Sequence, residues 1–336
     1  MAKRSGVSVA TVSRVLNEPE KVSESTRERV LEHVRALDYI PNAAARTLVR
    51  RRSQLVGVVI NTGVAHPDLK HPFFQDVLVG LKDAVDTHDY DLLLLSSRRN
   101  AQRRATQSFL GRALRQQVDG LVLMGVDRND ADLRALLERG LPVVAVDLDV
   151  TGVHAGYVMS DNVAGARLAV DHLASLGHDR IATITGLVHT TPGADRLRGY
   201  RDGLRAHRLR HRVSYVREGD FYPESGYAEM RRLLALPRPP TAVFAASDDI
   251  AVGALNAIAE AGLSAPDDVA VVGFDDAQIA PLLRPSLTTI RQDKGALGNA
   301  AGTALVAMIE SEDAAPPELV LPVELVVRES SGPHRG

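Results

Sequence analysis

The chain has 336 residues, 45% hydrophobic and 24% charged, which is the balance of an ordinary globular protein of two or three domains. It holds no cysteine, which excludes disulfides and thiolate zinc sites. No apolar run approaches the roughly 20 residues of a membrane span, and the first residues lack the apolar stretch of a signal peptide. We therefore expect a cytoplasmic protein without a membrane partner.

The net charge of −2 is unevenly distributed along the chain. Residues 1–52 hold 11 Lys and Arg against 6 Asp and Glu, whereas the remaining residues hold 29 against 36. A basic segment attached to an acidic body favours contact with a polyanion such as DNA. Chance unevenness would give the same counts, so this signal needs support from local patterns.

Three short helical patterns occupy the first 50 residues. Ser8 is placed to cap a helix over Val9–Asn17, and Ser23 is placed to cap a second helix with one apolar face. A third amphipathic stretch runs from Asn42 to Arg50. We therefore expect a small all-helical unit at the start of the chain.

After residue 53 the pattern changes to strands that alternate with helices, such as Phe74–His88 and Asp161–Leu176. Apolar strands in this rhythm predict parallel sheets covered on both faces, and two series of strands predict two doubly wound lobes. A final strand is expected within Leu319–Arg328. The two series are Leu55–Ile60, Asp91–Leu95, Gly120–Met124 and Val143–Val146, then Tyr157–Met159, Ile181–Thr185, Val213–Val216, Ala242–Ala245 and Val269–Gly273.

The segment Gly6–Asn17 has the form of a tight turn that leads into a capped helix. This is the geometry of a helix-turn-helix, whose second helix lies in the major groove of DNA. Val12 and Val15 or Leu16 would face the core, which leaves Arg14 free to reach a guanine edge or a phosphate. A small helical bundle with a solvated arginine is the alternative. The other outward residues are Val9, Ala10, Thr11 and Ser13.

Acidic and aromatic residues predict a ligand site in the body. Asp147, Asp248 and Asp275 each follow an apolar run, and ligands of open α/β sheets bind beyond the carboxyl ends of the strands. A polar ligand needs hydrogen-bond partners and an aromatic face. Phe73, Phe74 and Phe221 could supply the faces, and Arg196 a further hydrogen-bond partner.

For several residues near the predicted ligand site, a structural role is an alternative to ligand contact. Asp161 is expected to cap the following helix, and Asp248 could do the same. Asp276 is expected to be structural and Phe274 to lie in the core.

No enzyme pattern is present in the sequence. It lacks a glycine loop followed by Lys-Ser/Thr, a His-Glu-x-x-His motif and a Gly-x-Ser-x-Gly motif. His172 and His178 have no obvious third metal ligand. We expect a protein that is not an enzyme and that has no catalytic residues, metal or cofactor.

The segment Gly6–Asn17 resembles the signature of the lactose-repressor family (LacI/GalR type), and Asp38–Leu48 continues the resemblance in register. The body resembles the sensor of the same family over nearly its whole length, nearest to its ribose- and purine-sensing branch. Landmarks are His71–Phe74, Ser160–Asn162, Arg196–Tyr200, Gly219–Phe221, Ser247–Gly253, Val272–Asp276 and Pro285–Ile290.

The resemblance implies three parts: a helix-turn-helix head over residues 1–41, a hinge helix and linker over 42–53, and a periplasmic-binding-protein-like sensor over 54–330. The sensor's N-lobe would span about 54–155 and 287–315, and its C-lobe about 156–286 and 316–330. In this family the first helix begins about six residues before the position of Met1. We therefore expect a shortened first helix here and a natural start further upstream; the alternative is a weakened head.

For the head, the resemblance implies that Val9, Ala10 and Arg14 read bases, whereas Thr11, Ser13 and Asn17 contact phosphates. The hinge helix would fold when a dimer meets DNA and would place Asn42, Ala45 and Arg46 at the duplex. Leu48 would be an apolar wedge in the minor groove, which bends the DNA at the cost of unstacking. The alternative for Leu48 is packing on the sensor.

For the whole protein, the resemblance implies a transcription repressor that binds a pseudo-palindromic operator as a homodimer. A small effector in the inter-lobe cleft would control operator affinity, either as inducer or as corepressor. A sugar or a nucleoside is favoured, because Thr190 and Pro192 replace the residues that hold a purine in the purine-sensing branch. The alternative is a sugar-binding protein of this fold without a DNA role. The implied cleft residues are Phe73, Phe74, Asp147, Arg196, Phe221, Asp248 and Asp275.

Overall fold

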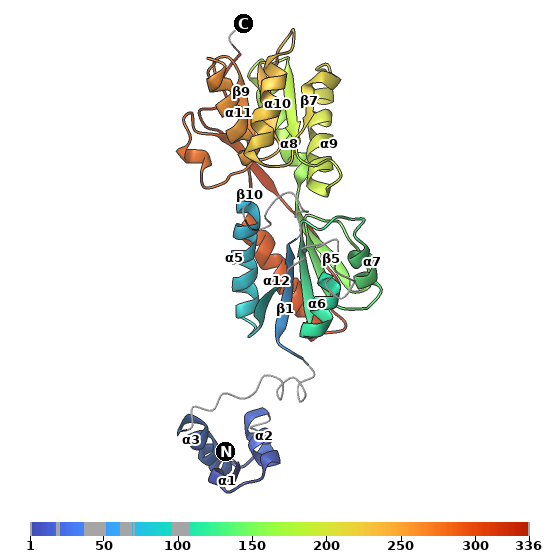
Figure 1. Ribbon diagram of the computed structural model, residues 1–336, viewed down its shortest axis with the longest axis vertical. Coiled ribbons are helices and arrows are strands. Elements are labelled where there is room, and N and C mark those ends of the chain that lie inside the picture. The colour runs from blue at the N-terminus through green and yellow to red at the C-terminus, as the bar shows by residue number, and fades with distance from the viewer. Residues whose placement is uncertain are drawn as a thin grey trace.

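The structure is a computed structural model that describes residues 2–17, 21–36, 52–60, 69, 71–95 and 108–334. At the N-terminus three short helices form one unit, α1 (Ala2–Ser5), α2 (Val9–Asn17) and α3 (Glu24–Ala36) (Figure 1). Val12, Val15 and Val30 form its buried core. The predicted cap of α2 is confirmed, because the Ser8 hydroxyl accepts a hydrogen bond from the Thr11 amide at 3.0 Å.

The first lobe is built on a six-stranded, fully parallel sheet. Helices α5 (Pro72–Asp86) and α12 (Lys294–Glu310) cover one face, and α6 (Phe109–Gln116) and α7 (Ala131–Leu137) cover the other. In sheet order the strands are β11 (Glu318–Leu321), β5 (Ala155–Ser160), β4 (Val143–Val146), β3 (Gly120–Met124), β1 (Leu55–Ile60) and β2 (Asp91–Leu95).

The second lobe repeats this plan on a second six-stranded sheet, in which only the β10–β12 pair is antiparallel. Helices α8 (Asn162–Ser175) and α9 (Thr191–Ala206) cover one face, and α10 (Pro223–Leu234) and α11 (Asp248–Glu260) the other. In order the strands are β12 (Val323–Val326), β10 (Thr288–Gln292), β9 (Ala270–Asp275), β8 (Ala242–Ala245), β6 (Ile181–Thr185) and β7 (Val216–Glu218). The expected pair of doubly wound lobes is therefore confirmed. Within the part of the chain that the structure describes, no helix is both long and apolar enough to span a bilayer.

Strand membership differs from the expectation in three places. Strand β5 pairs with β4 in the first sheet, although its run was expected to open the second series. The tail forms two strands rather than one, with β11 in the first sheet and β12 in the second. Val213–Tyr215 is a 3₁₀ turn that precedes β7. An apolar run marks a buried strand but carries no information on which sheet edge it joins.

The lobe boundaries shift accordingly. The chain crosses between the lobes at three points, just after β5, just after β10 and between β11 and β12. The expected boundaries lay near residues 155/156, 286/287 and 315/316. Strand β10 was missed because Thr288 and Thr289 make it too polar for an apolar run. Both threonines are fully buried, and their hydroxyls are hydrogen-bonded.

Glycines allow α5 and α12 to pack with their backbones in contact in the first lobe. A Cβ atom at Gly298 would lie 1.9 Å from the Val77 carbonyl oxygen, and one at Gly80 would lie 2.0 Å from the Gly295 carbonyl oxygen. The close contact fixes the position of α12, whose first residues reach the crossover after β10 (Figure 1).

We predict that Gly298→Ala lowers the free energy of unfolding by about 1–3 kcal/mol, because the added methyl group forces the two helices apart. Gly295→Ala on the same helix is the matched control. Its new Cβ would meet only Asp293 Oδ1 at 3.6 Å, so helix propensity should make it neutral or stabilising by up to about 1 kcal/mol. Urea denaturation followed by circular dichroism measures both. Equal effects of the two substitutions would contradict this packing account.

Candidate ligand cleft and nucleic-acid interface

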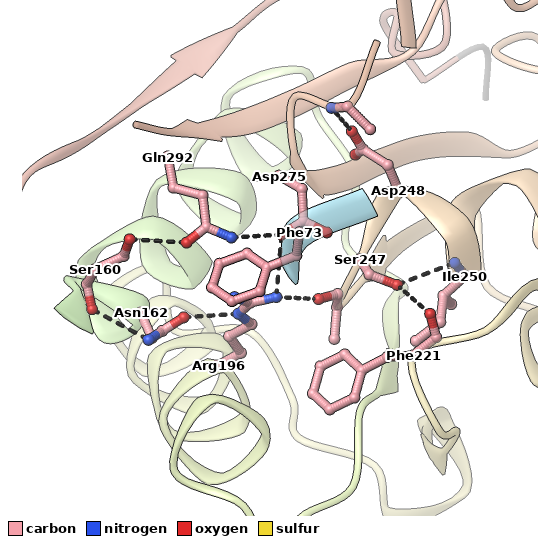
Figure 2. Close-up of polar contacts among 12 residues, drawn as sticks. Phe73, Ser160, Asn162, Arg196, Phe221, Ser247, Asp248, Ile250, Asp275 and Gln292 are labelled. Carbon is pink, nitrogen blue, oxygen red and sulfur yellow. Dashed lines mark hydrogen bonds and ion pairs between the residues drawn. The ribbon is translucent and has the colours of Figure 1, made fainter. Parts of the chain in front are cut away.

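A closed ring of polar contacts joins two of the crossovers (Figure 2). Ser160 ends β5 and donates to Gln292 Oε1 at 2.7 Å, and the Gln292 amide donates to Asp275 Oδ1 at 2.5 Å. Asp275 lies 3.7 Å from the guanidinium of Arg196, whose Nε donates to Asn162 Oδ1 at 2.8 Å. The Asn162 amide closes the ring on the Ser160 carbonyl oxygen at 3.1 Å. All five residues are buried, so these contacts are poorly screened by water.

Contacts within the protein itself hold the guanidinium of Arg196 in place. It belongs to α9, and its side chain is 4% exposed. Beyond the ring, its guanidinium donates to the Ala246 carbonyl oxygen at 2.5 Å and lies 3.7 Å from the ring centroid of Phe274. The Phe221 ring centroid is 5.9 Å away. The guanidinium is therefore fixed in orientation before any ligand arrives, which favours selective binding.

Asp147 follows β4, and one of its carboxylate oxygens can still accept a hydrogen bond. Its backbone is left-handed, with φ at 56°. Oδ1 is buried and has no hydrogen-bond partner among the described residues. Burial raises the pKa of Asp147 to about 6, because loss of water disfavours the charged form more than the nearby Arg196 favours it. A ligand hydroxyl would provide the missing hydrogen bond.

Asp248 is fully buried, and both of its carboxylate oxygens are used within the second lobe. Oδ2 accepts from the Ala277 amide at 2.7 Å, and Oδ1 accepts from the Thr289 hydroxyl at 2.5 Å. Burial and the neighbouring Asp275 raise its pKa well above the usual range. The structure does not support a capping role for Asp248, because Ser247 caps α11 by accepting from the Ile250 amide.

Aromatic rings reach the cleft from both lobes. Phe73 lies at the start of α5, where Pro72 at the first position and His71 at the cap fix the beginning of the helix. Its ring is 5.4 Å from that of Phe74, edge to face. In the second lobe, the Phe221 ring covers Gly186, where an added Cβ would lie 1.9 Å from ring carbon atoms. Phe73 and Phe221 both appear beside Arg196 in Figure 2.

A narrow pocket lies in the cleft between the lobes, and it has no space that would admit a water molecule. Its lining includes Phe73, Asp248 and Asp275 among the predicted residues, and also Lys294, which the sequence reasoning missed. The Lys294 ammonium donates to the Asp275 carbonyl oxygen at 2.8 Å and lies 3.3 Å from Asp76 on α5. The remaining lining residues are His71, Pro72, Asp249 and Ala277. No cluster of potential metal ligands occurs in the described part of the chain.

Three structural expectations hold. Asp161 caps α8 by accepting from the Ala164 amide at 2.9 Å. Asp276 forms ion pairs with Arg291 and Arg328, each at 2.7 Å. Phe274 is fully buried in the core of the second lobe.

Helix α2 presents an open face on the head. Val9 is 76% exposed, and Ala10 and Arg14 are exposed as well. Thr11 is half-buried, and its hydroxyl is hydrogen-bonded to that of Ser8 at 2.9 Å. Ser13 and Asn17 belong to α2, but their side chains lie outside the described set. The predicted hinge residues Asn42, Ala45, Arg46 and Leu48 also lie outside the described residues.

We predict that Asp147→Asn stabilises the protein at neutral pH and not at pH 4. The raised pKa means that the folded state resists ionisation of Asp147, so wild-type stability falls as pH rises from about 4 to 6. This pKa shift corresponds to about 2–3 kcal/mol. The free energies of unfolding of wild type and Asp147→Asn should therefore diverge by this amount between about pH 4 and 6. Urea denaturation from pH 4 to 7.5 measures it, with the exposed Asp83→Asn as control. A pH-independent difference would contradict burial as the cause of the raised pKa of Asp147.

Two family models match the chain. The model of bacterial regulatory proteins of the lacI family matches residues 1–42, and the periplasmic binding protein-like domain matches residues 170–331. These matches cover the helical head and most of the second lobe.

Relatives match almost the full length. The chain is 37% identical to the transcriptional regulator CelR of Thermobifida fusca over 98% of this chain and 96% of the relative. It is 34% identical to the ribose operon repressor of Haemophilus influenzae over 98% of this chain and 97% of the relative.

Solved structures agree with this likeness. A CelR–cellobiose complex superimposes with a TM-score of 0.77 at 35% identity, covering 98% of each chain. The lac repressor dimer bound to operator and the anti-inducer ONPF superimposes with a TM-score of 0.83 at 29% identity, covering 98% of this chain and 97% of the other. With its exposed α2 face, its two-lobed body and these relatives, the chain belongs to the LacI family and is a ligand-controlled, DNA-binding transcription regulator, near the ribose and purine branch.

Proposed function

We propose that this regulator is a cytoplasmic repressor that binds a pseudo-palindromic operator as a homodimer and responds to a neutral sugar or nucleoside in the cleft. The observation that carries the proposal is the polar ring around Arg196 and Asp275. A ligand that contacts these two residues also contacts the ring that joins two crossovers between the lobes. Occupation of the cleft then changes the energy of lobe closure.

The charge of the cleft favours a neutral effector. Asp147, Asp248, Asp249 and Asp275 outnumber the two cations, Arg196 and Lys294. Most of these carboxyl groups have raised pKa values because burial disfavours their ionisation, as it does for Asp249. A phosphorylated or carboxylated effector would add a further anion to this group. A polyol instead offers hydroxyl groups to carboxylate oxygens and an apolar ring face to Phe73 or Phe221.

Lobe motion follows from the size of the cleft. The pocket between the lobes has no room for a water molecule, whereas small-molecule sites typically measure roughly 300–1,000 Å³. Entry of a sugar therefore requires the lobes to separate. The CelR relative has been solved with cellobiose, which supports a sugar as effector here.

The linker to the head is attached to the opposite end of the first lobe. The Asp119 carboxylate accepts hydrogen bonds from the amides of Ser53 and Gln54, both at 2.8 Å. Arg52 donates to the Glu310 carbonyl oxygen at 3.3 Å, where α12 ends. Helix α12 begins at Lys294 in the cleft, and its 17 residues span about 25 Å. This one helix therefore connects the cleft with the attachment of the linker.

The function is tested by selecting bound sequences from a random DNA library with the full chain. We predict recovery of a pseudo-palindrome, because two-fold protein symmetry matches two-fold DNA symmetry. Arg14→Ala should weaken binding to that site by about 5- to 150-fold, equivalent to 1–3 kcal/mol, and relax one base position. The exposed Arg29→Ala on α3 is the control. Failure to select any site, both with this chain and with a chain that carries a full-length first helix, would support the alternative of a sugar-binding protein without a DNA role.

Asp119→Ala should separate sugar binding from DNA control. We predict that calorimetry finds the wild-type affinity for D-ribose, D-glucose or cellobiose, since the cleft lies at the other end of α12. The change in operator affinity caused by that sugar should fall from the 5- to 150-fold typical of allosteric proteins to about one-fold. The exposed Asp91→Ala at the same end of the sheet is the control. An unchanged response in Asp119→Ala would exclude this route.

A further inference from the structure

His71 combines a capping role with an unused polar atom. Its side chain is 8% exposed and accepts a hydrogen bond at Nδ1 from the Phe73 amide, 3.3 Å away, at the start of α5. Its Nε2 is buried and has no hydrogen-bond partner among the residues that the structure describes. His71 lines the cleft beside Phe73, Asp249 and Asp275.

The capping bond fixes the tautomer of His71. A nitrogen that accepts an amide hydrogen carries no proton of its own, so the proton of the neutral imidazole is on Nε2. Nε2 is therefore a hydrogen-bond donor without an acceptor. A buried donor without an acceptor is destabilising, so the cleft gains free energy when an acceptor reaches it.

Aromatic neighbours from both lobes fix the orientation of the imidazole ring. The Tyr222 ring of the second lobe lies 5.6 Å away at 90°, and the Phe74 ring of the first lobe lies 6.0 Å away at 65°. Since the cap also fixes one edge of the imidazole, the ring cannot turn Nε2 towards another acceptor without breaking the cap. The donor is preorganised.

We propose that His71 is an effector contact that donates Nε2–H to an oxygen of a sugar bound in the cleft. This inference rests on the proposed function and makes it more specific. Asp147 requires a ligand hydroxyl that donates, whereas His71 requires a ligand oxygen that accepts. A sugar offers accepting oxygens in its ring and on its hydroxyl groups. An effector that offers only donors leaves the His71 site unsatisfied.

The test uses His71→Asn in the full chain. Asparagine is a favoured N-cap residue, so the cap of α5 is kept and the unfolding midpoint should stay near that of wild type. Its side chain ends short of the Nε2 position. In calorimetry with D-ribose, D-glucose and cellobiose, the sugar that wild type binds should bind His71→Asn at least ten-fold more weakly. His88→Asn, an exposed histidine after the same helix, should bind it as wild type does. Binding of His71→Asn within two-fold of wild type would overturn the proposal.

A second measurement locates the proton on the His71 ring in the sugar-free protein and then follows it on addition of the sugar. In ¹⁵N-histidine-labelled protein, the His71 signals are identified by their loss in His71→Asn. We expect a protonated Nε2 and an unprotonated Nδ1 in the sugar-free protein, and a changed Nε2–H signal on addition of the sugar. A protonated Nδ1 would overturn the donor assignment. If wild type binds none of the three sugars, the sugar part of the proposed function fails, and the sugar-free spectrum still decides the state of His71.

Discussion

The buried pair of Arg196 and Asp275 is the interaction on which the sensor depends. Each partner alone would be a charge taken out of water, and a buried charge is tolerated only when it is paired and hydrogen-bonded. The ring through Ser160, Asn162 and Gln292 supplies those hydrogen bonds, and it does so with residues from the crossovers between the lobes. The contacts that stabilise the two buried charges are therefore the same contacts that fix the crossovers between the lobes.

Parallel topology explains why the cleft is there. The carboxyl ends of β4 and β9 bring Asp147 and Asp275 to facing edges of two sheets, and the crossovers hold the edges together. Second-lobe groups such as Asp248 are already hydrogen-bonded within their lobe, whereas Asp147 Oδ1 and His71 Nε2 in the first lobe lack partners among the described residues. A ligand in the cleft would provide hydrogen-bond partners for these first-lobe atoms.

The sequence predicted most strands and the head but not the distribution of strands between the lobes. Continuous apolar runs identify β1 to β4 with their observed bounds, because both faces of a parallel sheet are buried. The same signal cannot assign β5 to a sheet, and it misses β10, whose buried threonines satisfy their hydroxyls through tertiary contacts. Lys294 was missed as a consequence, since it follows β10. His71 lay within a recognised motif, but only the structure shows which of its nitrogens is used.

The most direct test of the account is the distance between the lobes. The chain has no cysteine, so Val153→Cys and Val213→Cys, at positions 84% and 81% exposed on the first and second lobes, accept spin labels specifically. Pulsed electron paramagnetic resonance gives the label distances for the free protein, with the bound sugar and with operator. We predict two populations of label distances, and both the sugar and the operator should change their ratio. A single distance distribution that neither changes would contradict lobe closure as the link between cleft and DNA.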